Sequence, residues 1–199
     1  MPHTIVVIAA IIGGLISIIA AIPYIRDIFL GKTKPERAMW WIYSALFILL
    51  FAAQLSAGAN WLLVISGTYI LAPTVIAILS LKYGYGSFHK RDLWSLVVAA
   101  LGIALWLLTD NPLMAILIVI VIDFAGFWLT LIKTWQAPHS ETLITWQLNC
   151  LTAIVSLFSI NTWSFAVVAY PVYAILATAL IVWLIMYRRT KIKKDLNDF

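Results

Sequence analysis

The sequence predicts an all-α integral membrane protein with seven transmembrane helices in a 3+1+3 parallel-repeat bundle. Of its 199 residues, 64% are hydrophobic and 11% are charged, whereas soluble domains are about 45–50% apolar and about 25% charged. Seven apolar segments reach the roughly 17–25 residues that a crossing requires. Nearly all of the chain lies in these segments, so residues 1–199 form one membrane domain. The predicted helices lie at about 5–29, 38–57, 60–82, 93–109, 112–135, 142–160 and 163–187.

The first segment has one alternative interpretation, a cleaved signal peptide. It lacks a basic start, and its apolar run is longer than such signals carry. It also continues through Pro23 into Arg26 and Asp27 without a small-residue cleavage site. We therefore expect a transmembrane helix here.

The loops between the segments alternate in charge, and this alternation predicts the orientation. Connections 56–59, 110–111 and 160–162 contain no Lys or Arg. Basic residues cluster in loops one, three and five and in the tail, as in Lys32, Lys34, Arg37, Lys82, Lys90, Arg91, Lys133, Arg188 and Arg189. Because Lys and Arg concentrate on the cytoplasmic side, we expect the N-terminus outside and the C-terminus in the cytoplasm. That result requires an odd number of crossings.

The order of features also predicts a duplication, with a first repeat at 5–82, a linker helix at 93–109 and a second repeat at 112–187. A basic tail, 188–199, follows. A single linking helix lets two triplets run in the same direction. Each repeat has a loop proline, a tryptophan near the start of its second helix, and a third helix with tyrosine and proline: Pro35, Trp40, Tyr69 and Pro73 in the first, and Pro138, Trp146, Tyr170 and Pro171 in the second.

Two stretches, PYIRDIFLGKTKP at 23–35 and LIKTWQAPHSE at 131–141, each place a proline beside a basic loop at the end of a helix. Together with the layout, they resemble the SWEET and PQ-loop (MtN3-like) superfamily of small membrane transporters. The chain departs from the family where Tyr24 follows Pro23 in place of glutamine, and where Gly126 stands in place of a proline. The resemblance implies transport of a small solute by alternating access.

Asp123 is the strongest functional signal, because it places a carboxyl group near the middle of the apolar stretch 112–136. A charge at that depth costs at least about 2.5–3.5 kcal/mol. Helical spacing puts six residues on one face, which we expect to line a cavity that opens at the Lys133 end: Asp123, Gly126, Phe127, Thr130, Lys133 and Thr134. Asp123 is either a substrate contact or protonation site, as likeness to cystinosin-type transporters implies, or a structural acid bonded to a neighbouring helix.

Further candidates lie on the other helices. Asn149 belongs to a polar stripe, Thr145, Asn149, Thr152, Ser156 and Ser159, which is also typical of close helix packing. The resemblance makes Tyr69, Tyr170 and Tyr173 walls of a central substrate pocket, with Pro73 and Pro171 as hinges; the alternative is a plain kink with packed tyrosines.

Near the end of the first helix, Pro23, Arg26 and Asp27 are candidates for a gate, although an exposed interfacial ion pair explains the same residues. The tryptophans at segment ends, Trp40, Trp41, Trp61, Trp94, Trp135 and Trp163, are typical of an aromatic belt at the membrane surface.

Several function classes lack support. The histidines, His3, His89 and His139, have no metal-ligand spacing, and Cys150 is a lone thiol in apolar surroundings. No cofactor or nucleotide motif is present, so we expect no enzyme, no cofactor and no nucleic-acid partner.

The sequence favours a transporter of a small polar solute such as a sugar or amino acid, with proton coupling through Asp123 as an option. The alternative is a receptor, sensor or trafficking-type binding protein on the same scaffold. We expect a small solute and membrane lipids as partners, with a homo-oligomer as a further option. The expected location is the bacterial inner (plasma) membrane.

Overall fold

The structure is a computed structural model that describes residues 2–85 and 111–197, together with positions 90, 93, 94, 97, 100, 101, 104, 105 and 108. The described residues form six α-helices and one short 3-10 helix, η1. The elements are α1 (His3–Phe29), α2 (Arg37–Ser56), α3 (Leu62–Tyr83), α5 (Pro112–Gln136), η1 (Pro138–Ser140), α6 (Leu143–Phe158) and α7 (Phe165–Asn197). The described part of the chain thus has six helices where the sequence predicted seven. All but scattered positions of the predicted linker, 93–109, lie outside the described residues.

Five of the helices, all except α6, are long and apolar enough to cross a membrane. Helix α6 has 16 residues, which span about 24 Å at 1.5 Å per residue, less than the roughly 30 Å of a hydrocarbon core. The predicted segment, 142–160, extends beyond α6 at both ends, because Thr142 and Ser159 are the caps of the helix.

The outer surface of the bundle is strongly apolar. Leu71, Leu81 and Leu176 are each more than 60% exposed, and large hydrophobic side chains on every helix face outward in the same way. A soluble protein does not expose so much contiguous apolar area. The chain is a helical integral membrane protein.

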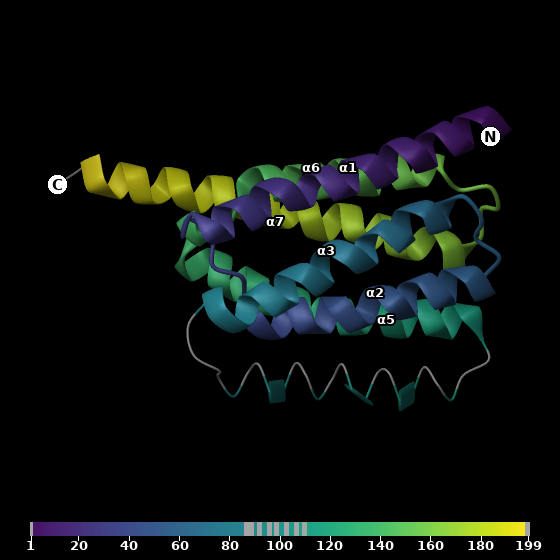
Figure 1. Cartoon of the computed structure of the whole chain (residues 1–199), viewed down its shortest axis with the longest axis horizontal. Helices are drawn as coiled ribbons and strands as arrows, with labels where there is room; N and C mark the ends of the chain where they lie inside the picture. Colours follow the sequence, from purple (N-terminus) through teal and green to yellow (C-terminus); the bar gives the residue numbers. More distant parts are fainter. Residues whose placement is uncertain are drawn as a thin grey trace.

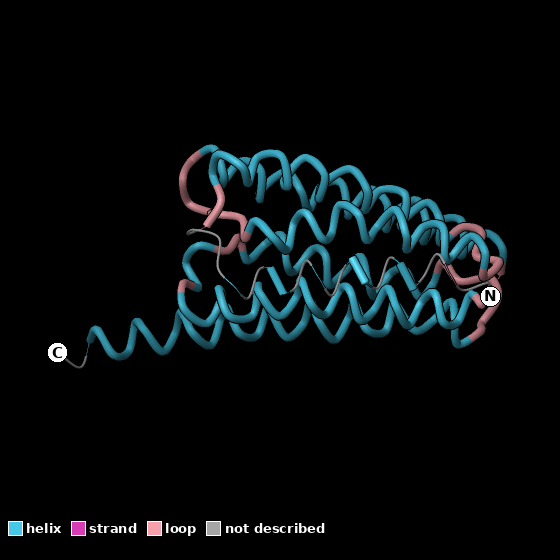
Figure 2. The backbone as a smooth tube through the Cα atoms, turned by 90° about the horizontal axis from the view of Figure 1, so that it is seen from below, coloured by secondary structure: helices cyan, strands magenta, loops and turns pink. Residues whose placement is uncertain are grey.

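The six helices run along one long axis (Figure 1, Figure 2), and their contacts close them into a ring. Going around it, each helix contacts the next in the order α1, α3, α2, α5, α7, α6 and back to α1. In each triplet, α1 to α3 and α5 to α7, the third helix therefore lies between the first and the second. The two triplets repeat the same order, so that α5, α7 and α6 take the positions opposite α1, α3 and α2 in the ring.

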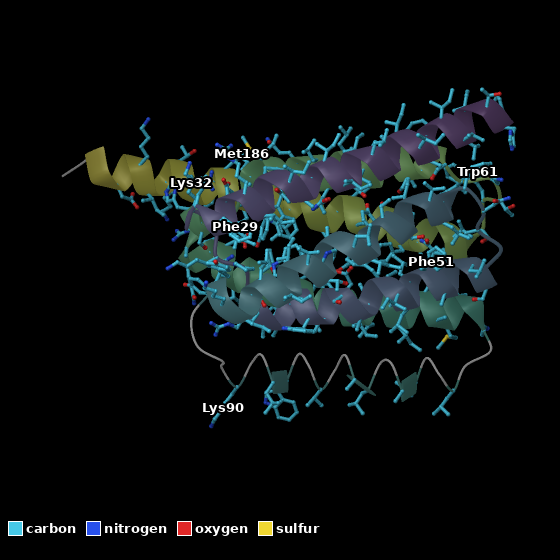
Figure 3. All side chains as sticks on the ribbon, in the orientation of Figure 1. Phe29, Lys32, Phe51, Trp61, Lys90 and Met186 are labelled. Carbon is cyan, nitrogen blue, oxygen red and sulfur yellow. The ribbon has the colours of Figure 1, made fainter. Side chains whose placement is uncertain are left out.

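The loops that follow the first helix of each triplet meet at one end of the bundle. The backbone N–H of Lys34 donates to the carbonyl of Ser140 over 3.2 Å, so the loop after α1 contacts the loop after α5. Lys32 lies toward this end and Trp61 at the other (Figure 3). We call the first the loop end.

Local sequence sets several helix boundaries. The Glu36 side chain caps α2 by accepting from the Met39 N–H over 2.7 Å, and Asn111 caps α5 by accepting from the Leu113 N–H over 2.9 Å. Gly31, with φ of 68°, and Gly58, with φ of 80°, make the turns after α1 and α2, which a side chain would strain.

Helix α7 is longer than predicted, because residues 188–197 continue it where the sequence analysis placed a separate tail. Arg, Lys and Leu favour helices, and no glycine or proline interrupts them. The Arg188 side chain donates to the Trp135 carbonyl over 3.0 Å, and Arg189 donates to the carbonyls of Pro138 and Glu141. In Figure 1 the end of α7 projects beyond the other helices.

Candidate functional site

The carboxylate of Asp123 lies at the centre of the ring and accepts three hydrogen bonds from tyrosines. Tyr170 donates to Oδ2 over 2.7 Å, while Tyr173 and Tyr43 donate to Oδ1 over 3.0 and 3.1 Å. The Asp123 residue is only 4% exposed. The donors come from α2 and α7, and the acceptor from α5, so one carboxyl group joins the two triplets.

Backbone geometry explains how these groups converge. Tyr170 and Tyr173 are three residues apart and so lie on one face of α7. On the neighbouring helix α2, Tyr43 packs on Gly126, one turn beyond Asp123, where an added Cβ would lie 3.3 Å from the tyrosine ring. The close approach of α2 to α5 at this glycine brings the phenol within reach of the carboxylate.

A cavity of about 90 Å³ lies beside Asp123 and is lined from all six helices. All five residues predicted to bind substrate line it: Tyr69, Asp123, Asn149, Tyr170 and Tyr173. The six residues of the predicted inward face of α5 are all buried, but only Asp123 and Phe127 among them line the cavity. Sequence periodicity thus identified the buried side of α5.

Sequence reasoning missed Tyr43 and misassigned Trp40. Tyr43 carried no signal, because a tyrosine within an apolar segment is common and only the neighbouring helix gives it a partner. Trp40 was assigned to the aromatic belt, but it is 5% exposed and lines the cavity, as does Trp146. Both are the fourth residue of the second helix of their triplet, and that repeated position was the available signal. The tryptophans at 41, 94, 135 and 163 are exposed.

The polar stripe of α6 divides into two parts. Thr152, Ser156 and Ser159 donate to carbonyls of their own helix, as packing residues do. Thr145 donates to the Ala20 carbonyl of α1 over 2.9 Å. Asn149 lines the cavity, and within the described part of the chain no side chain or carbonyl, that of Asp123 included, bonds its amide.

The loop end of the bundle is closed, contrary to the expected opening at Lys133. The Lys133 ammonium pairs with Glu141 Oε1 over 2.5 Å, and the two side chains are 0% and 1% exposed. Lys133 also donates to the carbonyls of Lys34 and Ser140, while Trp146 donates to Glu141 Oε2 over 2.9 Å. The lysine turns back into the protein because the α5–α6 loop supplies these acceptors.

Two further contacts join the triplets at the same end. The hydroxyls of Thr33 and Thr142 lie at hydrogen-bond distance, and Thr142 donates to Asp27 over 3.0 Å. We refer to Asp27, Thr33, Lys34, Lys133, Ser140, Glu141 and Thr142 as the interloop cluster.

The predicted gate and hinge residues are dispersed. Pro73 lines the cavity, and Pro171 lines a smaller one of about 10 Å³ nearer the opposite end. Pro23 lies within α1 and lines neither cavity. Arg26 is exposed, and among the described residues it forms no ion pair with Asp27, which instead accepts from Thr142. The interfacial ion pair considered as the alternative for these residues is therefore not formed between Arg26 and Asp27.

Among the described residues no group of three or more His, Cys, Asp or Glu is arranged to hold a metal ion. Comparison with protein-family models, curated proteins and solved structures gave no match for this chain.

Proposed function

We propose that this protein is a carrier that moves a small polar solute across the membrane by alternating access. The observation that carries the proposal is the position of Asp123: a carboxylate at the junction of two triplets of matching order, beside a cavity that all six helices line. A buried acid in a membrane segment is a functional group by default.

The ring order supports a transporter of the SWEET and PQ-loop type. In a 3+1+3 chain, rocking of one triplet against the other would open the cavity to each side in turn. We place the linker helix at 93–109, the N-terminus outside and the loop end in the cytoplasm, in a bacterial inner (plasma) membrane. In this arrangement the interloop cluster is the closed cytoplasmic gate.

Access to the cavity can be measured with one introduced cysteine. In a Cys150→Ala background, Ala174→Cys places a thiol at the cavity wall, whereas Leu176→Cys, on the same helix, is 67% exposed on the outer surface. Proteoliposomes are treated with a membrane-impermeant maleimide on one side at a time. A carrier predicts modification of Ala174→Cys from both sides, and little modification of the lipid-facing control from either.

Modification from one side only would contradict alternating access and favour the receptor alternative. Equal modification of both cysteines would mean that the reagent does not distinguish the cavity from the outer surface. Flux separates the two functions directly, because a receptor saturates with ligand and carries none across.

We also propose that transport is coupled to protons through Asp123. Solute uptake into proteoliposomes is compared at two pH values for the wild type and for Asp123→Asn, which keeps the shape and removes the titratable group. We expect the pH response to disappear in the variant. An equal response in both proteins would exclude coupling through Asp123.

A further inference from the structure

We propose that the cavity beside Asp123 selects a small organic cation, a primary ammonium compound of about four or five non-hydrogen atoms. As a statement about a transported solute, this inference rests on the proposed function; as a statement about binding, it rests on the cavity itself. Charge, hydrogen-bond polarity, aromatic lining and size support it separately.

The first argument is charge. Asp123 is the one residue with a formal charge among those that line the cavity. The nearest lysine along α5 is Lys133, ten residues or about 15 Å further on, and it is paired with Glu141. An ionised carboxylate in the membrane interior is costly without a counter-charge, and the lining supplies none. A cationic ligand would provide it.

The second argument is the direction of the hydrogen bonds. The phenol protons of Tyr43, Tyr170 and Tyr173 all point to Asp123, so their oxygens are left as acceptors. The hydroxyl groups of Thr145 and Thr178 donate to backbone carbonyls. Those of Ser17 and Thr68 lie at hydrogen-bond distance from backbone carbonyls and from each other, so their protons are also bound within the protein.

The two indole N–H groups of the lining are also engaged. Trp40 donates to Tyr24 over 3.3 Å, and Trp146 donates to Glu141. Within the described residues, this leaves the Asn149 amide and the Tyr69 hydroxyl as uncommitted donors. A lining that offers mainly acceptors is complementary to an ammonium group, which has three N–H donors, and is poorly matched to a carboxylate or phosphate.

The third argument is aromatic. Eight of the twenty lining residues are Phe, Tyr or Trp, and the faces of such rings attract cations by about 0.5–2 kcal/mol each when solvent is excluded. Size gives the limit: a cavity of about 150 Å³ accommodates benzene, so about 90 Å³ fits a smaller molecule. Sugars and most amino acids exceed this volume.

The test uses three probes of similar shape and different charge: n-propylammonium, 1-propanol and propanoate. Ligand-observed NMR titration of the detergent-solubilised full chain gives their dissociation constants. We expect propylammonium to bind at least tenfold more tightly than propanol, and propanoate to show no saturable binding. Asp123→Asn should reduce the preference for propylammonium over propanol to threefold or less.

Tyr69 provides a second variant that leaves the Asp123 hydrogen bonds intact. Tyr69→Phe keeps the ring and should bind propylammonium as the wild type does, whereas Tyr69→Leu should weaken binding at least threefold. This pair decides the question if Asp123→Asn does not fold. Propanol or propanoate binding as tightly as propylammonium would overturn the inference, and so would a preference that persists in folded Asp123→Asn or an equal affinity in the two Tyr69 variants.

Flux experiments separate this inference from the carrier. Saturable binding of propylammonium without its uptake into proteoliposomes would refute transport and leave the cation site standing. Uptake of a neutral solute, without preferential binding of the ammonium probe, would support transport and refute the cation site.

Discussion

Removing one partner of the buried Lys133–Glu141 pair should be the most destabilising single substitution at the loop end. In Glu141→Gln, the Lys133 ammonium keeps its charge but loses its only carboxylate within the described residues, while the carbonyls of Lys34 and Ser140 stay in contact. An uncompensated buried charge is expensive.

The magnitude follows from burial. Both side chains are at most 1% exposed, so solvent does not screen them, and breaking such a pair costs about 3–5 kcal/mol. Lys133→Met should cost a similar amount, because it leaves the buried Glu141 carboxylate without the ammonium group that it pairs with, although the Trp146 N–H still donates to it. The double variant, Lys133→Met with Glu141→Leu, removes both charges, and we expect it to recover most of the loss.

The assay is reversible unfolding in mixed micelles, followed by circular dichroism at increasing denaturant concentration. Lys191→Met removes a lysine of the same type from an exposed position on α7, and we expect a change within about 0.5 kcal/mol. Wild type, Lys133→Met, Glu141→Leu and the double variant with both of these substitutions give a double-mutant cycle.

Two results would refute this reasoning. A loss below about 1 kcal/mol in both single variants would mean that water reaches the pair and screens it. A double variant that loses the sum of the two single losses would mean that the side chains contribute independently.

Three further predictions concern the site and its scaffold. Tyr170→Phe removes the shortest bond to Asp123 and should lower the free energy of unfolding by about 1.5–3 kcal/mol, as for hydrogen bonds to charged groups; an unchanged denaturation midpoint would contradict that bond. Gly13→Ala places a Cβ 2.5 Å from an Ile65 methyl group, whereas Gly14→Ala meets nothing nearer than 3.4 Å. Gly13→Ala should therefore lower the free energy of unfolding by about 1–3 kcal/mol through overpacking, and Gly14→Ala should leave it unchanged or raise it. The reverse order would exclude this packing of α1 on α3. Asn111→Ala should cost about 0.5–2 kcal/mol by removing the cap of α5, and Asn111→Ser should retain most of that stability in the same assay.

Sequence periodicity predicted the buried side of α5 better than it predicted the partners of Asp123. A charge in an apolar segment is expected to face the interior, and the helical repeat fixes which neighbours share its face. Tyr173 was assigned to the cavity by the family resemblance and not by periodicity. Tyr43 was not predicted, because its partner lies eighty positions away on another helix.

The loop end was predicted poorly for a related reason. Lys133 was expected to border an opening, but Glu141 lies eight residues later, beyond the end of α5, and η1 turns it back toward the lysine. Helical spacing carries no information across such a turn. The extension of α7 was missed because a run of basic residues was interpreted by its charge, although the same residues are good helix formers.

Helix α7 makes contacts both at the centre of the bundle and at its loop end. Tyr170 and Tyr173 of α7 hold the Asp123 carboxylate, and sixteen residues beyond Tyr173, about 24 Å at helical rise, Arg189 holds the Pro138 and Glu141 carbonyls. The helix has no proline after Pro171, so little bending can absorb a displacement in between. A change at Asp123 that displaced Tyr173 along the helix axis would therefore displace Arg189 as well, and with it the contact between α7 and the loop that follows α5.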